Sequence, residues 1–330
     1  MKKMKTMVIS MVTWIMSLNT ITTVSALSCN GMQGLCDLPI NKVTLPGAHN
    51  AGAGFNGDLH YDWGWWGSPV AGSCFYKNVD RNFYNMLNSG VRFFDIDICL
   101  YGSQLESCHS DAYGGALKIA FNQIDNFMRS HPNEVIILHF NRDVNGNRGT
   151  VAQKIAAELE KRWDPNVGSN YVKMSTCDSR WPTLRKAIES KQRIFIFMHS
   201  ELADHLKLTS KPYVYTSSYF MRLTWEQVFI GPGGCDRIID PARRKYDSDS
   251  DFIELSAFGT KGLCVWEMAW YCSRSLQRAA DECYKQRSKY GKTVNVILVD
   301  YPVSNYYGSE SVMTRARVLN TKNIQRFSGK

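Results

Sequence analysis

The 330-residue chain lacks several patterns that would place it in a common binding class. It contains no Lys- and Arg-rich run of the kind that follows a phosphodiester backbone, so nucleic acid is not an expected partner. It has no CxxC motif and no Cys/His spacing suited to zinc. It also has no GxGxxG motif after its first predicted strand, which argues against a dinucleotide-binding fold.

Long apolar runs are also scarce, and the one near the N-terminus predicts a signal peptide over residues 1–26. A basic segment, an apolar stretch and a small-residue cleavage pattern follow one another there: Lys2, Lys3 and Lys5, then residues 7–16, then Val24-Ser25-Ala26. The apolar stretch is too short to span a bilayer comfortably, although an uncleaved anchor is the alternative interpretation. No second stretch of spanning length follows. We therefore expect residues 27–330 to form one soluble, secreted, extracellular domain.

The charge of the chain is moderate. Its formal net charge is +9, and it falls to +6 without the three lysines of the predicted leader. Because this charge is spread along the chain, the sequence is compatible with mild attraction to an anionic membrane surface and does not indicate a polyanion-binding tract.

All ten cysteines lie after the predicted leader. An even number of cysteines in an exported chain predicts disulfides. Short spacings favour three pairs, Cys29 with Cys36, Cys99 with Cys108, and Cys272 with Cys283. The sequence alone does not fix the connectivity.

Predicted strands alternate with predicted helices along most of the chain, which indicates a parallel sheet, either open or closed into a barrel. The expected strands are 42–50, 91–98, 134–141, 193–199 and 294–300. The expected helices are 81–90, 116–131, 149–162, 182–192 and 273–289, and 200–262 is not assigned. The tail from Pro302 is expected to wrap over the surface and to end in a basic helix, with no domain boundary or repeat before it.

Four predicted strands end in a polar side chain on a face that is otherwise apolar. These residues are His49, the pair Asp95 and Asp97, Asn141, and Asp300. In a (β/α) barrel the carboxyl ends of the strands converge at the mouth where catalysis occurs. The pattern therefore favours a TIM-type α/β barrel over an open sheet.

The acidic pair is the least expected feature of this pattern. Alternation along 91–98 places Val91, Phe93, Asp95 and Asp97 on one face. Two carboxylates at the end of an apolar strand are costly to bury unless a cation lies between them. The alternative is an exposed strand end with solvated acids.

The motifs LPGAHN, GVRFFDIDI and FMRSHPNEVIILHFN, with a histidine after the intervening loop, resemble the catalytic X region of phosphatidylinositol-specific phospholipase C. The resemblance is dense over residues 40–143 and fits a short secreted form. It implies a distorted TIM barrel that cleaves a phosphodiester. His49 matches the base that takes the proton from the inositol 2-hydroxyl, giving a cyclic phosphate, and His109 matches the acid that protonates the leaving oxygen. Asp300 matches the acid that orients the base.

The same resemblance implies a metal. Metal-independent bacterial members have an arginine where this chain has Asp97, as in the calcium-dependent members. Asn50, Asp95 and Asp97 match three calcium ligands, and Asn141 stands where the fourth is usually glutamate. These oxygen donors suit a hard cation, with Ca²⁺ expected ahead of Mg²⁺ and with low affinity.

The expected substrate is a phospholipid or a glycosylphosphatidylinositol at a membrane surface, and no stable protein partner is implied. The alternative enzymes are a glycerophosphodiesterase or a sphingomyelinase-D-like phospholipase, which share the acid–x–acid strand end. From a different class, the chain could be a non-catalytic secreted barrel that binds lipid or glycan. His139, which shares a face with Asn141, is expected to be a hydrogen-bonded core histidine.

Overall fold

The structure is a computed structural model. It describes residues 27–57, 59–61, 74–110, 112–141, 146–167, 169–176, 181–206, 211–224, 250–259, 264–304 and 311–328. The predicted leader at 1–26, Cys177 and Cys235 lie outside these residues.

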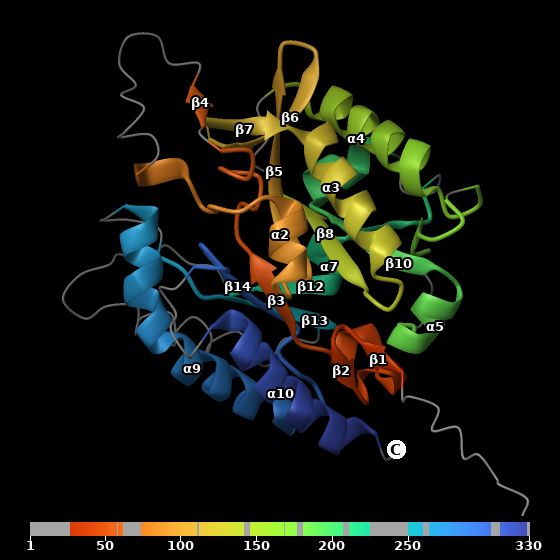
Figure 1. The fold of residues 1–330 in the computed structure, drawn as a ribbon, viewed down its shortest axis with the longest axis vertical. Helices are drawn as coiled ribbons and strands as arrows, with labels where there is room; N and C mark the ends of the chain where they lie inside the picture. Colours follow the sequence, from red (N-terminus) through yellow and green to blue (C-terminus); the bar gives the residue numbers. More distant parts are fainter. Residues whose placement is uncertain are drawn as a thin grey trace, which may run out of the picture.

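Eight parallel strands form the central sheet, in the spatial order β11-β10-β8-β5-β3-β14-β13-β12 (Figure 1). They are β3 (Leu45–Ala48), β5 (Phe93–Tyr101), β8 (Ile136–Phe140), β10 (Gln192–Met198), β11 (Val214–Thr216), β12 (Met221–Leu223), β13 (Phe252–Ser256) and β14 (Val296–Val299). This is chain order around a (β/α) barrel, with no ladder joining β11 to β12 among the described residues. The expectation of a distorted TIM barrel is confirmed, with the distortion at this opening.

Helices cover the outside of the sheet. They are α2 (Phe83–Asn88), α3 (Leu117–Ser130), α4 (Arg148–Trp163), α5 (Leu184–Glu189), α6 (Ser200–Ala203), α7 (Ser217–Phe220), α9 (Val265–Lys289) and α10 (Val312–Phe327). One buried cluster joins β5 and β8 to α2, α3 and α4, and a second joins β13 and β14 to α9 and α10. In Figure 1, α9 and α10 lie together at the lower left, away from α3 and α4.

The barrel interior is apolar toward the amino-terminal ends of its strands. Every second residue of the strands points inward, and the inward residues include Leu45, Phe93, Ile137, Phe252 and Val296. They pack in one cluster with the N-terminal segment, which contains strands β1 (Ser28–Cys29) and β2 (Met32–Gln33) and short 3-10 helices at Leu35–Asp37 and Ile40–Lys42. The amino-terminal end of the barrel is thereby closed, and polar side chains remain for the carboxyl end.

The strand that carries the acidic pair is longer than predicted. β5 continues beyond the barrel and pairs antiparallel with β6 (Gln104–His109), which pairs with β7 (Ala112–Ala116) and through it with β4 (His60–Tyr61). The expected loop between Cys99 and Cys108 is therefore a β-hairpin, because residues 99–101 continue the ladder of β5. We call β6, β7, β4 and the end of β5 the hairpin extension.

The disulfides confirm two of the three expected pairs and contradict the third. Cys29–Cys36 and Cys99–Cys108 are bonded, and an unexpected bond joins Cys74 to Cys264 across 190 residues. The pairing of Cys272 with Cys283 is wrong, because Cys283 is a buried free thiol. Both residues lie in the single helix α9, where eleven residues rise about 16 Å, beyond the reach of a disulfide. Cys272 is disulfide-bonded elsewhere.

The C-terminal tail ends in the expected helix, α10, and one face of this helix packs against the outside of the barrel. Asn320 of α10 accepts a hydrogen bond from the backbone of Thr44 at 2.7 Å and donates to the Thr44 carbonyl at 2.8 Å. Both residues are buried. Thr44 immediately precedes β3, so α10 helps to hold the strand that leads to His49. None of the helices within the described ranges is long and apolar enough to cross a membrane.

Replacing Asn320 with alanine should destabilise the fold, because it leaves a buried N–H and a buried C=O of Thr44 without partners. We expect a loss of about 2–4 kcal/mol of unfolding free energy, measured by urea denaturation. The matched control is Asn126→Ala at an exposed position of α3, which should change stability by less than about 0.5 kcal/mol. Equal effects of the two substitutions would contradict the assigned role of α10.

Candidate active site

The register of β3 against β14 places His49 beside Asp300. Gly47 lies opposite Leu298, and a Cβ added at Gly47 would meet the Leu298 side chain at 2.9 Å. A larger residue would have to displace this buried side chain, so glycine fits best here. The backbone N–H of His49 then donates to the Val299 carbonyl at 2.9 Å. As a result, the first residue after β3 and the first residue after β14 lie side by side.

His49 and Asp300 form a buried ion pair. The His49 Nδ1 is 2.8 Å from Asp300 Oδ1, and Asp300 is 1% exposed. Burial alone would lower the pKa of His49, but the negative charge and hydrogen bond of Asp300 outweigh it and hold this pKa above its ordinary value. Because Asp300 accepts from Nδ1, the Nε2 atom is the one that can take a proton from a substrate.

Two residues that the sequence did not single out complete the surroundings of His49. The ring of Phe258 stacks on the imidazole at a centroid distance of 3.7 Å and an interplanar angle of 10°. The Nδ2 of Asn78 donates to Asp300 Oδ1 at 2.7 Å. The imidazole is therefore held by contacts on its face and its edge, which limits its rotation.

The hairpin extension delivers His109 to the same mouth. His109 is the last residue of β6, and its neighbour Cys108 is bonded to Cys99. The His109 Nδ1 donates to the carbonyl of Tyr76 at 3.0 Å, since a carbonyl can only accept. The centroids of the His109 and His49 rings are 6.4 Å apart at an interplanar angle of 69°. The structure therefore brings together His49, His109 and Asp300, the three residues that the resemblance indicates.

The acidic pair points into the barrel. Asp95 and Asp97 are each 2% exposed, and they alternate with Ile96 and Ile98 of the outer apolar cluster. Contrary to expectation, Val91 does not lie on the same face as Asp95 and Asp97. It precedes β5 and packs in the outer cluster. The alternative of a solvated strand end is excluded.

A buried histidine compensates one of these acids. Asp95 and His139 are register partners on β5 and β8, and His139 Nδ1 lies 3.0 Å from Asp95 Oδ1 with both side chains almost fully buried. Burial would raise the pKa of Asp95, but the hydrogen bond and charge of His139 hold it below its ordinary value. His139 is thus a core histidine, as the sequence suggested, and its Nδ1 lies at ion-pair distance from Asp95.

The four expected metal ligands lie after or at the ends of the neighbouring strands β3, β5 and β8. Asn50 is 3% exposed, and Nδ2 of the half-buried Asn141 donates to Asp95 Oδ1 at 3.3 Å. No group of three or more His, Cys, Asp or Glu side chains placed to hold a metal ion occurs within the described ranges. A cation here would be held by two carboxylates and two amide oxygens, and this donor chemistry fits a weakly bound hard cation.

The barrel contains a further acid, Glu254, that the sequence did not single out. Glu254 lies on β13 on the same inward face as Phe252, and it is 3% exposed. Burial, followed by the charge of Asp95, raises its pKa to about 7, although the Ser256 hydroxyl donates to Oε1 at 2.9 Å. The alternation of residues in FIELS could have indicated Glu254, but this stretch lies in the segment 200–262, which was not assigned. Asn78 left no comparable signal, because it lies in a loop.

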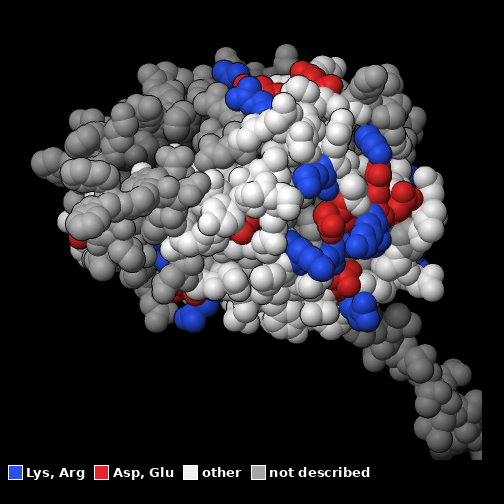
Figure 2. Space-filling view, turned by 90° about the horizontal axis from the view of Figure 1, so that it is seen from above, with Lys and Arg blue, Asp and Glu red and all other residues white. Residues whose placement is uncertain are grey.

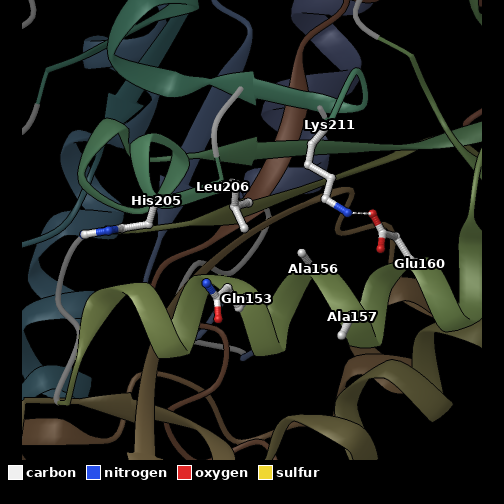
Figure 3. A pocket seen from close by; sticks show the side chains of 7 residues that line it. All are labelled: Gln153, Ala156, Ala157, Glu160, His205, Leu206 and Lys211. Carbon is white, nitrogen blue, oxygen red and sulfur yellow. Dashed lines mark hydrogen bonds and ion pairs between the residues drawn. The ribbon is translucent and has the colours of Figure 1, made fainter. Parts of the chain in front are cut away.

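The mouth differs from the hollow shown in Figure 3. That hollow, of about 370 Å³, lies between α4 and the segment that begins with the 3-10 helix Asp204–Leu206. Its lining is Gln153, Ala156, Ala157, Glu160, His205, Leu206 and Lys211, with an ion pair between Lys211 and Glu160. It contains none of the predicted site residues, so we place the candidate site at the strand ends. On the face seen in Figure 2, the described Lys and Arg residues lie interspersed with Asp and Glu.

The structure thus places a carboxylate-paired histidine opposite a second histidine at the carboxyl end of a parallel-strand barrel. Comparison with known proteins gives the family. The PI-PLC X family model (PI-PLC X 1) matches residues 35–230. The PI-PLC X domain-containing protein 1 of Arthroderma benhamiae is 24% identical over 194 residues, 56% of this chain and 54% of that protein. The chain thus spans about half the length of this relative.

Solved structures show the same fold. The F249X mutant of phosphatidylinositol-specific phospholipase C from Staphylococcus aureus superposes with a TM-score of 0.60 at 14% identity, covering 87% of this chain and 96% of that one. The phosphatidylinositol-specific phospholipase C from Listeria monocytogenes gives 0.56 at 14% identity, covering 86% and 97%. The chain belongs to the PI-PLC X domain family.

Glu254→Gln should stabilise the protein at high pH. The pKa of Glu254 is raised from 4.5 to about 7 in the folded state. Its contribution is therefore fully present below about pH 4.5 and is lost as the pH rises through 7. Above pH 7 the neutral glutamine should gain roughly 3 kcal/mol over wild type, and below pH 4.5 almost nothing.

Urea denaturation between pH 4 and 9, with chelator present, measures this difference. The control is Glu189→Gln on the exposed end of α5, which should follow wild type at every pH. A stability difference for Glu254→Gln that does not change with pH would contradict the assignment.

Proposed function

We propose that the chain is a secreted phosphodiesterase that cleaves phosphatidylinositol-type lipids to diacylglycerol and a cyclic inositol phosphate. The observation that carries this proposal is the His49–Asp300 pair facing His109 at a ring-centroid distance of 6.4 Å. The family and the fold support it. Both histidines are present in the geometry that acid–base catalysis requires, which favours an enzyme over a non-catalytic barrel.

His49 serves as the general base. Its Nδ1–H is committed to Asp300, so Nε2 accepts the proton of the inositol 2-hydroxyl. The hydroxyl oxygen then attacks phosphorus and closes the five-membered cyclic phosphate. Asp300 stabilises the imidazolium that forms, and Phe258 keeps the ring from turning away.

His109 serves as the general acid. Its Nδ1–H is held by the Tyr76 carbonyl, which orients the ring and leaves Nε2 available to the substrate. The proton on Nε2 passes to the diacylglycerol oxygen as the bond from phosphorus to that oxygen breaks. Exchange of the two roles would allow water to open the cyclic product.

We also propose a calcium ion held by Asn50, Asp95, Asp97 and Asn141. When bound, such an ion would polarise the phosphoryl oxygen and ease deprotonation of the attacking hydroxyl. The support is the burial of the two carboxylates, since two anions held close together in a nearly dry site favour a bound cation. With two carboxylates, the affinity should suit millimolar extracellular calcium.

Export of the protein is part of the same proposal. The sequence pattern of residues 1–26 supports it, and so do the disulfides Cys29–Cys36, Cys74–Cys264 and Cys99–Cys108. Disulfides of this kind form and persist in oxidising compartments. A substrate in the outer leaflet of a membrane fits this location.

His49→Ala and His109→Ala should each reduce turnover of phosphatidylinositol at least about a hundredfold without unfolding the protein. Release of diacylglycerol from vesicles measures turnover, and circular dichroism checks the fold. With a nitrophenyl leaving group, which departs without a proton, the loss in His109→Ala should shrink while the loss in His49→Ala persists. His205→Ala, at an exposed position beside α4, is the control. Wild-type turnover in either histidine variant would remove that histidine from the mechanism.

Chelation should abolish activity, and added calcium should restore it. Calorimetric titration should detect one weak calcium site, and Asp97→Asn should weaken it at least about tenfold, since one of two anionic ligands is lost. Asp204→Asn, an exposed control, should bind calcium as wild type does. Full activity in excess chelator, together with no calcium heat, would refute the calcium proposal while leaving the histidine assignments to their own test.

A further inference from the structure

The side chain of Asn78 contacts both His49 and Asp300. Among the described residues, no other residue outside the predicted set does so. Its Nδ2 donates to Asp300 Oδ1 at 2.7 Å and lies 3.3 Å from His49 Nδ1. Because the His49 Nδ1–H already points to Asp300, the two donors share one carboxylate oxygen. The Asn78 side chain thus fills the corner between the base and its carboxylate.

The backbone of Asn78 is tied to both loops that carry this pair. Its N–H donates to the carbonyl of Ala53, in the turn after His49, at 3.0 Å. Its carbonyl accepts from the N–H of Tyr301, directly after Asp300, at 2.7 Å. Asn78 itself is 1% exposed. A movement of either loop would therefore change the position of the Asn78 amide, and the amide couples the two side chains.

The oxygen of the Asn78 amide lacks a hydrogen bond within the described chain, which costs stability. The Asn78 Oδ1 is buried and has no hydrogen-bond partner among the described residues. A buried carbonyl without a partner costs stability, and an apolar side chain would avoid that cost. The asparagine is therefore explained by the bond from its Nδ2 to Asp300, made despite the unpartnered Oδ1. Such local costs are typical of functional sites.

We propose that Asn78 is a positioning residue that fixes the Asp300 carboxylate against His49 Nδ1, so that His49 Nε2 faces the substrate hydroxyl. The terminal torsion of an aspartate has broad wells, so one contact to histidine does not hold the carboxylate plane. The Asn78 donor supplies the second contact on the same oxygen. The inference rests on the proposed function for its kinetic consequence and on geometry alone for the hydrogen bond.

The kinetic test is a double-mutant cycle. Asn78→Ala should lower kcat about ten- to a hundredfold with little change in KM, because Asn78 orients the base and does not touch substrate. In an Asp300→Ala background the same substitution should cost almost nothing, since the group it acts through is gone. Asn78→Asp keeps the shape but replaces the donor with a charge facing Asp300, so it should be at least as slow as Asn78→Ala.

Two controls locate the effect. Asn88→Ala, at an exposed position of α2, should retain wild-type kcat and KM. With a nitrophenyl leaving group the loss in Asn78→Ala should persist, as expected for a defect on the side of the base. Equal losses from Asn78→Ala in the wild-type and Asp300→Ala backgrounds would show a merely structural role and overturn the proposal.

A proton NMR experiment tests the same proposal without substrate. The proton between His49 Nδ1 and Asp300 should give a low-field resonance that His49→Ala abolishes, and Asn78→Ala should shift or broaden it. An unchanged resonance in Asn78→Ala would also overturn the proposal. If the wild-type enzyme cleaves no phosphatidylinositol, the proposed function fails, and this resonance still decides whether Asn78 holds the pair.

Discussion

The pairing of β3 with β14 is the contact on which the site depends. Gly47 lets the two strands approach, and the bond from His49 N–H to the Val299 carbonyl fixes their register. A shift by one residue would turn His49 or Asp300 out of the barrel. The role proposed for His49 rests on this register, since Asp300 occupies Nδ1 of His49 and leaves Nε2 for the substrate. Asn320 of α10 supports the same strand from outside.

The second constraint is the cost of placing several acids in a nearly dry barrel. The structure meets it differently at each acid: Asp300 pairs with His49, Asp95 pairs with His139, and Glu254 has a pKa near 7. Asp97 is a fourth buried carboxylate, and it lies at the mouth, where we propose that a cation binds.

The sequence predicted the parts of the site that local pattern controls. Period-two alternation with a terminal polar residue located His49, Asp95, Asp97 and Asp300, because parallel strands bring these ends together. It could not predict Asn78, since a loop residue is placed by hydrogen bonds to Ala53 and Tyr301 that are distant in the chain. The Cys272–Cys283 pairing failed because spacing ignores the geometry of a helix that continues through both residues.

In the proposed mechanism, two histidines transfer protons while the substrate's own hydroxyl attacks phosphorus. Phosphorus NMR of phosphatidylinositol vesicles incubated with the enzyme and calcium tests it most directly. Inositol 1,2-cyclic phosphate should be the first water-soluble product. Phosphatidic acid, or an inositol monophosphate without a preceding cyclic species, would contradict it and favour attack by water, as in a glycerophosphodiesterase-type barrel.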